Sequence, residues 1–121
     1  MTRKEISGIR DLTFSQWIRE KLPDSSTGFM ISDLDFILYN YKTKKIMLLE
    51  VKTRDTKLRQ WQSILFTLLE KWIKKGIDSD YLFLGFHIII FENNSYSDGK
   101  IYFDNEEISE IDLINKLSFV S

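Results

Sequence analysis

The stretch from Ser32 to Thr53, SDLDFILYNYKTKKIMLLEVKT, decides the fold. Two runs dense in β-forming residues, DFILYN and KIMLLEVK, lie on either side of a polar segment, which predicts an antiparallel hairpin. The runs are apolar at odd and even positions alike, so we expect both strands to be central strands of a sheet with helices packed on it. Four charged residues interrupt this apolar pattern: Asp33, Asp35, Glu50 and Lys52.

Helix and strand patterns on either side of the hairpin complete one α/β domain over residues 1–121, a length that suits a single core. Residues 12–21 are expected to form a short helix, and residues 58–75 a long one with apolar residues at helical spacing. Residues 81–92 are expected to form a buried strand that pairs with residues 101–104, and a closing helix follows the cap Ser109. The predicted order is α-β-β-α-β-β-α, with a mixed central sheet flanked by helices.

Composition excludes several classes of protein. The chain has no cysteine, which rules out disulfides and thiolate metal sites and favours a cytoplasmic setting. No apolar run reaches the roughly 18 residues of a membrane span, and the first residues lack the apolar core of a signal peptide. We therefore expect a soluble, unprocessed intracellular protein with no membrane partner and no organic cofactor.

Charge is unevenly distributed along the chain, although the net charge is only −1. Residues 42–75 hold ten basic and three acidic residues, whereas residues 76–121 hold two basic and nine acidic residues. A basic block that begins in the hairpin and continues through the next helix is typical of a surface that binds a polyanion such as nucleic acid. A solvated helix face would give the same pattern.

The hairpin spacing predicts where the charged residues meet. If the turn is centred between Lys42 and Thr43, paired residues have numbers that sum to 85, so Asp35 lies opposite Glu50 and Lys52 shares the face of Glu50. Two carboxylates with Cβ atoms about 4.5–5.5 Å apart repel each other unless one holds a proton or a cation lies between them. Mg²⁺ meets this need, because it takes oxygen ligands, accepts one or two carboxylates and retains water for exchange with a phosphate.

Asp35, followed by Glu50-Val51-Lys52 on the next strand, resembles the core of the PD-(D/E)XK nuclease superfamily over residues 12–92. Members bind Mg²⁺ or Mn²⁺ and hydrolyse phosphodiester bonds. The resemblance implies that Asp35, Glu50 and the Val51 carbonyl hold the metal and that Lys52 is the catalytic lysine. No proline precedes the aspartate, and a pairing sum of 83 would set Asp33 opposite Glu50, so Asp33 is the alternative or an additional ligand.

The loop and helix after the lysine extend the resemblance to small phage-type nucleases, and Holliday-junction resolvases are also among superfamily members of this size. Leu58 and Gln62 match a Leu-x-x-x-Gln pattern, which implies that Gln62 contacts the attacking water or a phosphate at the metal and acts with the catalytic residues. A phage- or virus-encoded source fits this resemblance. The candidate nucleic-acid contacts are Arg54, Lys57 and Arg59, with Lys42 and Lys44 of the turn.

Two further titratable residues are expected to be structural. In some members of the superfamily a glutamate of the first helix joins the metal site, and Glu20 is the candidate here, but a solvated charge is the favoured interpretation. His87 lies on the predicted strand 81–92 without a second histidine or a cysteine. It is therefore expected to be a core histidine with a hydrogen-bond partner.

Together these residues predict a metal-dependent DNA nuclease, a hydrolase of the endonuclease type. A small domain that cuts two strands needs two active sites, so we expect a homodimer. The same residues serve enzymes that cut duplexes, junctions, flaps and single strands, which leaves the substrate structure open. The alternative is a non-catalytic nucleic-acid-binding or regulatory module on the same scaffold.

Overall fold

The computed structural model describes residues 13–53, 59–93 and 96–120. The chain divides into two compact units, residues 1–32 and residues 33–121. The first unit contains α1 (Thr13–Lys21) and the 3₁₀ turn η1 (Ser25–Thr27), and no residue of α1 is buried. The prediction of a single nuclease domain over the whole chain stays a prediction.

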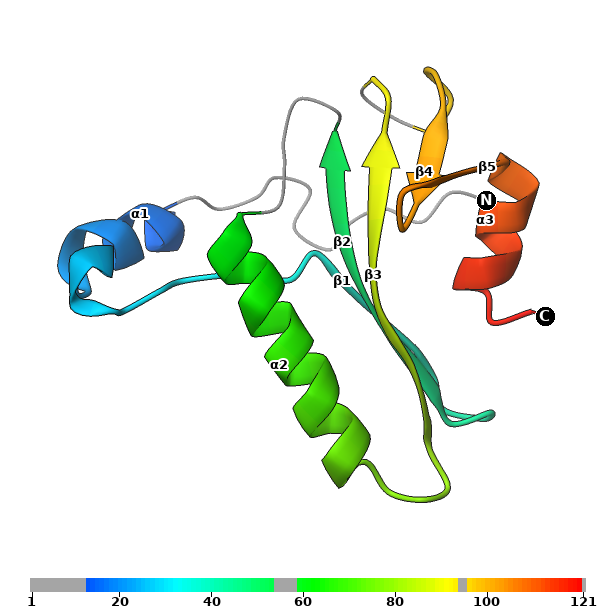
Figure 1. Cartoon of the computed structure of the whole chain (residues 1–121), viewed down its shortest axis with the longest axis horizontal. Coiled ribbons are helices and arrows are strands. Elements are labelled where there is room, and N and C mark those ends of the chain that lie inside the picture. The colour runs from blue at the N-terminus through cyan, green and yellow to red at the C-terminus, as the bar shows by residue number, and fades with distance from the viewer. Residues whose placement is uncertain (1–12, 54–58, 94–95, 121) are drawn as a thin grey trace. The chain divides into compact units, whose positions relative to one another are not determined.

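A five-stranded mixed sheet organises the second unit. β2 and β3 are parallel neighbours connected through α2, and the other neighbouring strands are antiparallel (Figure 1). The mixed α/β class and the mixed sheet are therefore confirmed, and the structure has one strand more than the predicted order. Across the sheet the strands are β1 (Phe36–Asn40), β2 (Lys45–Thr53), β3 (Leu82–Phe91), β4 (Ile101–Phe103) and β5 (Glu106–Ile108), and the helices of this unit are α2 (Gln60–Gly76) and α3 (Glu110–Leu117).

The register of the β1–β2 hairpin is the predicted one. Phe36 pairs with Leu49, and each further pair has residue numbers that sum to 85. Extended by one residue beyond β1, this register sets Asp35 opposite Glu50 and excludes the sum of 83 that would have brought Asp33 there.

β1 is an edge strand, which corrects the expectation that both hairpin strands are central. In the described sheet β1 pairs with β2 alone, whereas β2 also pairs with β3. Phe36, Ile37 and Tyr39 are 54%, 62% and 53% exposed, while β2 is buried from Met47 to Glu50. An apolar pattern shows only that a strand can be buried. Whether the strand lies at the edge of the sheet depends on strand order, and β3 pairs with β2 on the side away from β1.

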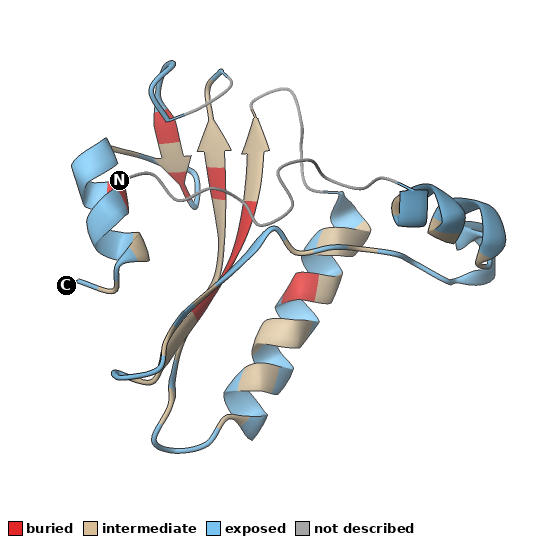
Figure 2. Ribbon diagram, turned by 180° about the vertical axis from the view of Figure 1, so that it is seen from behind, coloured by how far each residue is buried: buried red, intermediate tan, exposed pale blue. Residues whose placement is uncertain are grey.

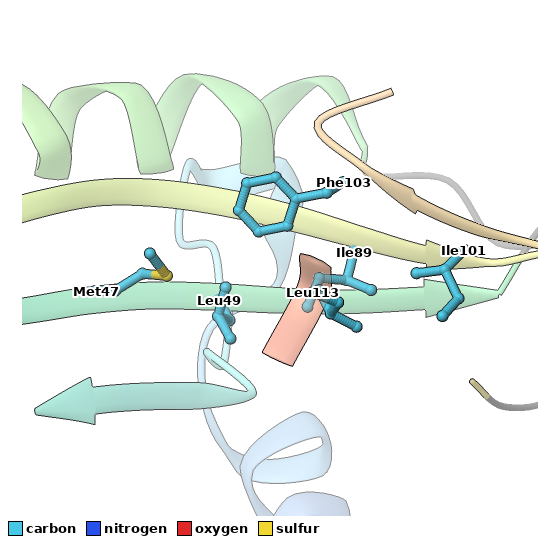
Figure 3. Packing of buried hydrophobic residues seen from close by; sticks show 6 residues of the cluster. All are labelled: Met47, Leu49, Ile89, Ile101, Phe103 and Leu113. Atoms are coloured by element: carbon cyan, nitrogen blue, oxygen red, sulfur yellow. The ribbon is translucent and has the colours of Figure 1, made fainter. Parts of the chain in front are cut away.

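Different helices cover the two faces of the sheet. On one face Phe66 of α2 is 3% exposed and stacks on Phe86 of β3, with 4.3 Å between ring centroids. On the other face α3 contributes Leu113 to the main apolar cluster, and Figure 3 shows the side chains of this cluster. The other five members are Met47, Leu49, Ile89, Ile101 and Phe103.

Glu50 belongs to the face that α2 covers. Its strand neighbour two residues earlier, Leu48, pairs in the ladder with Phe86, and alternate residues of a strand share a face. Figure 2 shows buried segments on β2, β3, β4 and α2. The carboxyl of Glu50 is thus placed on the same face as the apolar residues Leu48 and Phe86.

α2 is less buried than its apolar pattern predicts. It runs from Gln60 to Gly76, close to the expected bounds, and Phe66 is its only buried residue. Ile64 and Trp72 are each 54% exposed. No helix among the described residues is long and apolar enough to cross a membrane.

β5 is the strand that the sequence did not predict. Asp104 and Asn105, with φ of 49° and 71°, form the two-residue connection between β4 and β5. Two successive positive φ values are typical of a type I′ turn, for which Asp and Asn are favoured residues. The predicted closing helix follows as α3, and its Ser109 hydroxyl accepts a hydrogen bond from the Asp112 N–H at 3.1 Å.

Candidate metal and catalytic site

Asp35 and Glu50 come together at the open end of the hairpin. Asp35 directly precedes β1, and its Oδ2 accepts a hydrogen bond from the Val51 N–H at 2.9 Å. The side chain thus takes the place of a backbone acceptor at the end of the ladder and fixes Asp35 beside β2. A further hydrogen bond joins the carboxyl groups of Asp35 and Glu50.

Glu50 is the buried member of this pair. It is 2% exposed, whereas Asp35 is exposed. Burial, the hydrogen bond with Asp35 and repulsion by the Asp35 charge raise the pKa of Glu50 from 4.5 to about 8. Without a cation the pair therefore retains a proton at neutral pH.

One oxygen of Glu50 has no protein partner. Among the buried side-chain oxygens and nitrogens of the described residues, Oε2 of Glu50 is the one without a hydrogen bond. Leaving a buried acceptor unpaired costs about 1–3 kcal/mol. A bound cation would satisfy this oxygen and would also remove the repulsion between the two carboxylates.

Lys52 and Asp33 also act on Glu50. Lys52 is half-buried, shares the face of Glu50, and lowers its pKa by electrostatic attraction. Asp33 is exposed and raises the pKa of Glu50 by repulsion. Three charged residues, Asp33, Asp35 and Lys52, therefore act on the buried carboxyl group of Glu50.

These residues fit a hard divalent cation such as Mg²⁺ or Mn²⁺. Asp35 and Glu50 supply two carboxylates, and the N–H and C=O of a strand residue point to the same side, so the Val51 carbonyl faces β1 as its N–H does. No group of three His, Cys, Asp or Glu side chains within the described residues is arranged to hold a metal. A bound ion would thus complete its shell with water, as Mg²⁺ commonly does.

Gln62 has a role at the start of α2. Its Oε1 accepts a hydrogen bond from the Arg59 N–H at 3.2 Å, which is the reciprocal contact of a helix cap. Arg59 is exposed. Arg54, Lys57 and Leu58 lie outside the described residues, and the contact of Gln62 with a water or phosphate stays a prediction.

The lysines of the hairpin turn lie away from the carboxyl pair. Lys44 forms an ion pair with Asp80 at 2.7 Å, and Lys42 is exposed. Lys52 lies eight positions after Lys44, which corresponds to about 26 Å along the strand. The structure therefore separates these predicted nucleic-acid contacts from Lys52 and places them at the opposite end of the hairpin.

His87 forms a second polar pair on the α3 face. Its Nδ1 lies 2.6 Å from Asp104 Oδ2, and its Nε2 lies 2.6 Å from the Leu84 carbonyl oxygen. Asp104 Oδ1 accepts a hydrogen bond from the Ile88 N–H at 3.0 Å. The expected hydrogen-bond partner of His87 is confirmed, but the side chain is half-buried and not part of the core. Glu20 is exposed on α1, as expected for a solvated charge.

The Val51 N–H is the site group that the sequence did not identify. Backbone contacts leave no pattern in side-chain types, and the one available signal was an aspartate immediately before a strand.

Comparisons with protein family models, with curated proteins and with solved structures found no match. The site is therefore interpreted from its own geometry.

Proposed function

We propose that the chain is a divalent-metal-dependent nuclease that hydrolyses phosphodiester bonds in DNA, with a restriction-endonuclease-like core of the PD-(D/E)XK type. One observation carries this proposal: a buried Glu50 oxygen without a partner lies in a carboxyl pair with Asp35. Lys52 on the same strand face supplies the adjacent amine. Cation ligands and an amine on one surface are the groups that phosphodiester hydrolysis needs.

Each residue has a distinct role in the proposed reaction. Asp35, Glu50 and the Val51 carbonyl hold Mg²⁺ or Mn²⁺, with Asp33 as an additional acidic group near the ligands. A metal bound there would polarise the phosphate and lower the pKa of a bound water molecule. Lys52 orients the attacking water and donates hydrogen bonds to the phosphate oxygens as negative charge develops on them.

The position of the pair in the fold supports this assignment. Asp35 is exposed, so a phosphate can reach the site from solvent, while Glu50 is held by the buried strand β2. Burial strengthens the electrostatic interaction between ligand and cation. DNA is the proposed polyanion because residues 42–75 carry the excess of basic residues, and a homodimer would present two such sites to two strands.

Cleavage of a panel of DNAs tests the proposal. Plasmid, linear duplex, single-stranded, flap and four-way-junction DNAs are incubated with Mg²⁺ or Mn²⁺, and with EDTA as the metal-free control. We expect metal-dependent cutting that falls by roughly 100-fold or more in Glu50→Gln and in Lys52→Met.

The matched control is Lys45→Met, which removes the same charge from the same strand on the opposite face and is expected to leave cleavage unchanged. Circular dichroism checks that each variant is folded. If the wild-type protein binds these DNAs and cuts none of them with either metal, the nuclease proposal is wrong and the binding-module alternative replaces it.

A further inference from the structure

A pocket on the α2 face bears on the substrate. A pocket of about 480 Å³ lies between the β1–β2 hairpin and the C-terminal end of α2. This volume is within the range of roughly 300–1,000 Å³ that is usual for small-ligand pockets. Its lining is apolar and aromatic, and consists of Tyr39, Ile46, Ile73, Gly76, Ile77 and Tyr81.

Two tyrosines form a preorganised wall of this pocket. The rings of Tyr39 and Tyr81 are stacked, with 6.5 Å between centroids and 25° between planes, and a side-chain hydrogen bond joins them. Lys44 Nζ lies 5.5 Å from the Tyr81 ring centroid and is itself held by the ion pair with Asp80. Rings that are already fixed lose little conformational entropy when a flat ligand stacks on them.

Basic residues flank the same pocket. Lys42 and Lys44 belong to the turn between Tyr39 and Ile46, and Lys74 and Lys75 form the last turn of α2 beside Gly76. The acidic residues nearby are Glu70, Asp78 and Asp80. Asp80 pairs with Lys44 and Glu70 pairs with Lys74 at 3.4 Å, which leaves a small net positive charge. An apolar, aromatic hollow with a net positive rim is complementary to a nucleobase attached to a charged backbone.

The pocket lies on the same sheet face as the carboxyl pair. Ile46 is four residues from Glu50 on β2, and Tyr39 is four residues from Asp35, so each strand separates pocket and site by about 13 Å. Ile37, on the same face of β1 between Asp35 and Tyr39, is 62% exposed. A single strand covers this distance in about two to four nucleotides, since stacked nucleotides rise about 3.4 Å each and extended ones more.

We propose that this pocket binds one unpaired nucleobase, two to four nucleotides from the phosphodiester bond that is cut at Asp35 and Glu50. The inference rests on the proposed nuclease function and specifies its substrate class as single-stranded or locally unpaired DNA. A base inside a duplex is stacked on both sides and cannot enter, whereas a free base can stack on tyrosine without regard to its identity.

Gly76 provides a way to fill the pocket without disturbing the wall. A Cβ atom added at Gly76 meets no atom within 4 Å, so alanine fits there without a clash and leucine is the larger probe. Gly76→Leu places an aliphatic side chain at the pocket lining, and Gly76→Ala is the matched control. Both variants leave the carboxyl pair and Lys52 unchanged.

Binding of single-stranded 20-mers in Mg²⁺ tests the proposal, with Lys52→Met as the parent so that the DNA is not cut during the measurement. Each oligonucleotide carries one abasic site at a different position near the bond that wild-type protein cleaves. We expect one position, two to four nucleotides from that bond, at which the abasic site weakens binding of the parent by about 5- to 100-fold. The double variant Lys52→Met/Gly76→Leu should bind intact DNA as weakly as the parent binds the DNA with that abasic site, and its binding should not depend on the abasic position. The double variant Lys52→Met/Gly76→Ala should retain the dependence of the parent.

The failures of the two proposals are distinguishable. If wild-type protein cuts DNA but no abasic position matters, or if Gly76→Leu keeps the full dependence, the pocket does not bind a base and the nuclease proposal stands. If wild-type protein neither binds nor cuts any DNA, both proposals are wrong. If Gly76→Leu leaves DNA binding intact and changes the sedimentation coefficient, the pocket holds a protein side chain at an interface, which also overturns the inference.

Discussion

Two carboxyl groups lie on opposite faces of one sheet in contrasting surroundings. Asp104 gives one oxygen to His87 and the other to the Ile88 N–H, and His87 uses its second ring nitrogen on the Leu84 carbonyl. Glu50 shares a hydrogen bond with Asp35, and its Oε2 is buried without a partner. The first pair is complete within the protein, whereas the second needs something that the protein does not supply.

This difference separates a structural pair from a functional one. Hydrogen bonding within the protein is the usual state of buried polar groups, so a paired group needs no ligand to explain it. A buried group that lacks a partner destabilises the fold and is retained where it serves binding or catalysis. The unpaired oxygen of Glu50 therefore supports the proposal that places the site on the α2 face.

The largest expected effect is the pH dependence of the unfolding free energy, which tests the difference between the two carboxyl pairs. In the unfolded chain Glu50 loses its proton near pH 4.5, but in the folded protein its pKa is about 8. Folding thus takes up a proton between these values, and the metal-free protein should lose on the order of 3–5 kcal/mol of stability as the pH rises from about 4.5 to 8. Urea unfolding in EDTA across this range measures the slope.

Two controls sharpen that measurement. Glu50→Gln removes the titrating group and should remove most of the slope. Mg²⁺ should raise the melting temperature more at pH 8 than at pH 6, because below the pKa of Glu50 the cation competes with a proton. An equal Mg²⁺ effect in wild type and Glu50→Gln would show that the cation binds elsewhere.

On the α3 face the expected effect is smaller and independent of metal. Asp104→Ala leaves both His87 Nδ1 and the Ile88 N–H without their acceptor, which should cost about 1–3 kcal/mol of unfolding free energy. Asp104→Asn retains an acceptor for the Ile88 N–H and tolerates the φ of 49°, so it should cost less. Stabilisation by Mg²⁺ should be the same in both variants as in wild type, and its loss would contradict the independence of the two faces.

The smallest effect is expected at Gly85. This residue has φ of 97°, and an added Cβ would lie 3.1 Å from Glu70 Oε1 and 3.2 Å from His87 Nε2. Gly85→Ala should therefore lower the unfolding free energy by about 1–2 kcal/mol while leaving DNA cleavage unchanged. Gly76→Ala, at a position with open space, is the control, and equal urea midpoints for the two variants would contradict this account.

The sequence predicted which charged residues of the hairpin face each other, because two local features determine it. The turn position sets the pairing of Asp35 with Glu50, and the strand period of two puts Lys52 on the face of Glu50. The edge position of β1 was not predictable in this way, since strand order follows from the non-local pairing of β2 with β3. Local pattern thus determines which side chains face each other, but not which strand is covered.

The second polar pair shows the same limit of local pattern. The partner of His87, Asp104, lies 17 residues later in the chain, in a turn that the sequence pattern did not predict. Asp104 and Asn105 were the available signal, because adjacent residues that tolerate positive φ favour a two-residue hairpin and hence strand β5. The unpaired oxygen of Glu50 had no signal in the sequence, since it depends on side chains that several elements bring together.

The edge position of β1 has a consequence for motion. Asp35 precedes a strand with one neighbour, whereas Glu50 lies on a strand with two. Opening of β1 alone would part the two carboxyls at the cost of the packing of Leu38, while the buried residues of the cluster stay in place. A cation that bridges them would close this hinge, and amide hydrogen exchange of residues 36–40 would slow on its addition. The β1–β2 hairpin would then be most rigid in the cation-bound state.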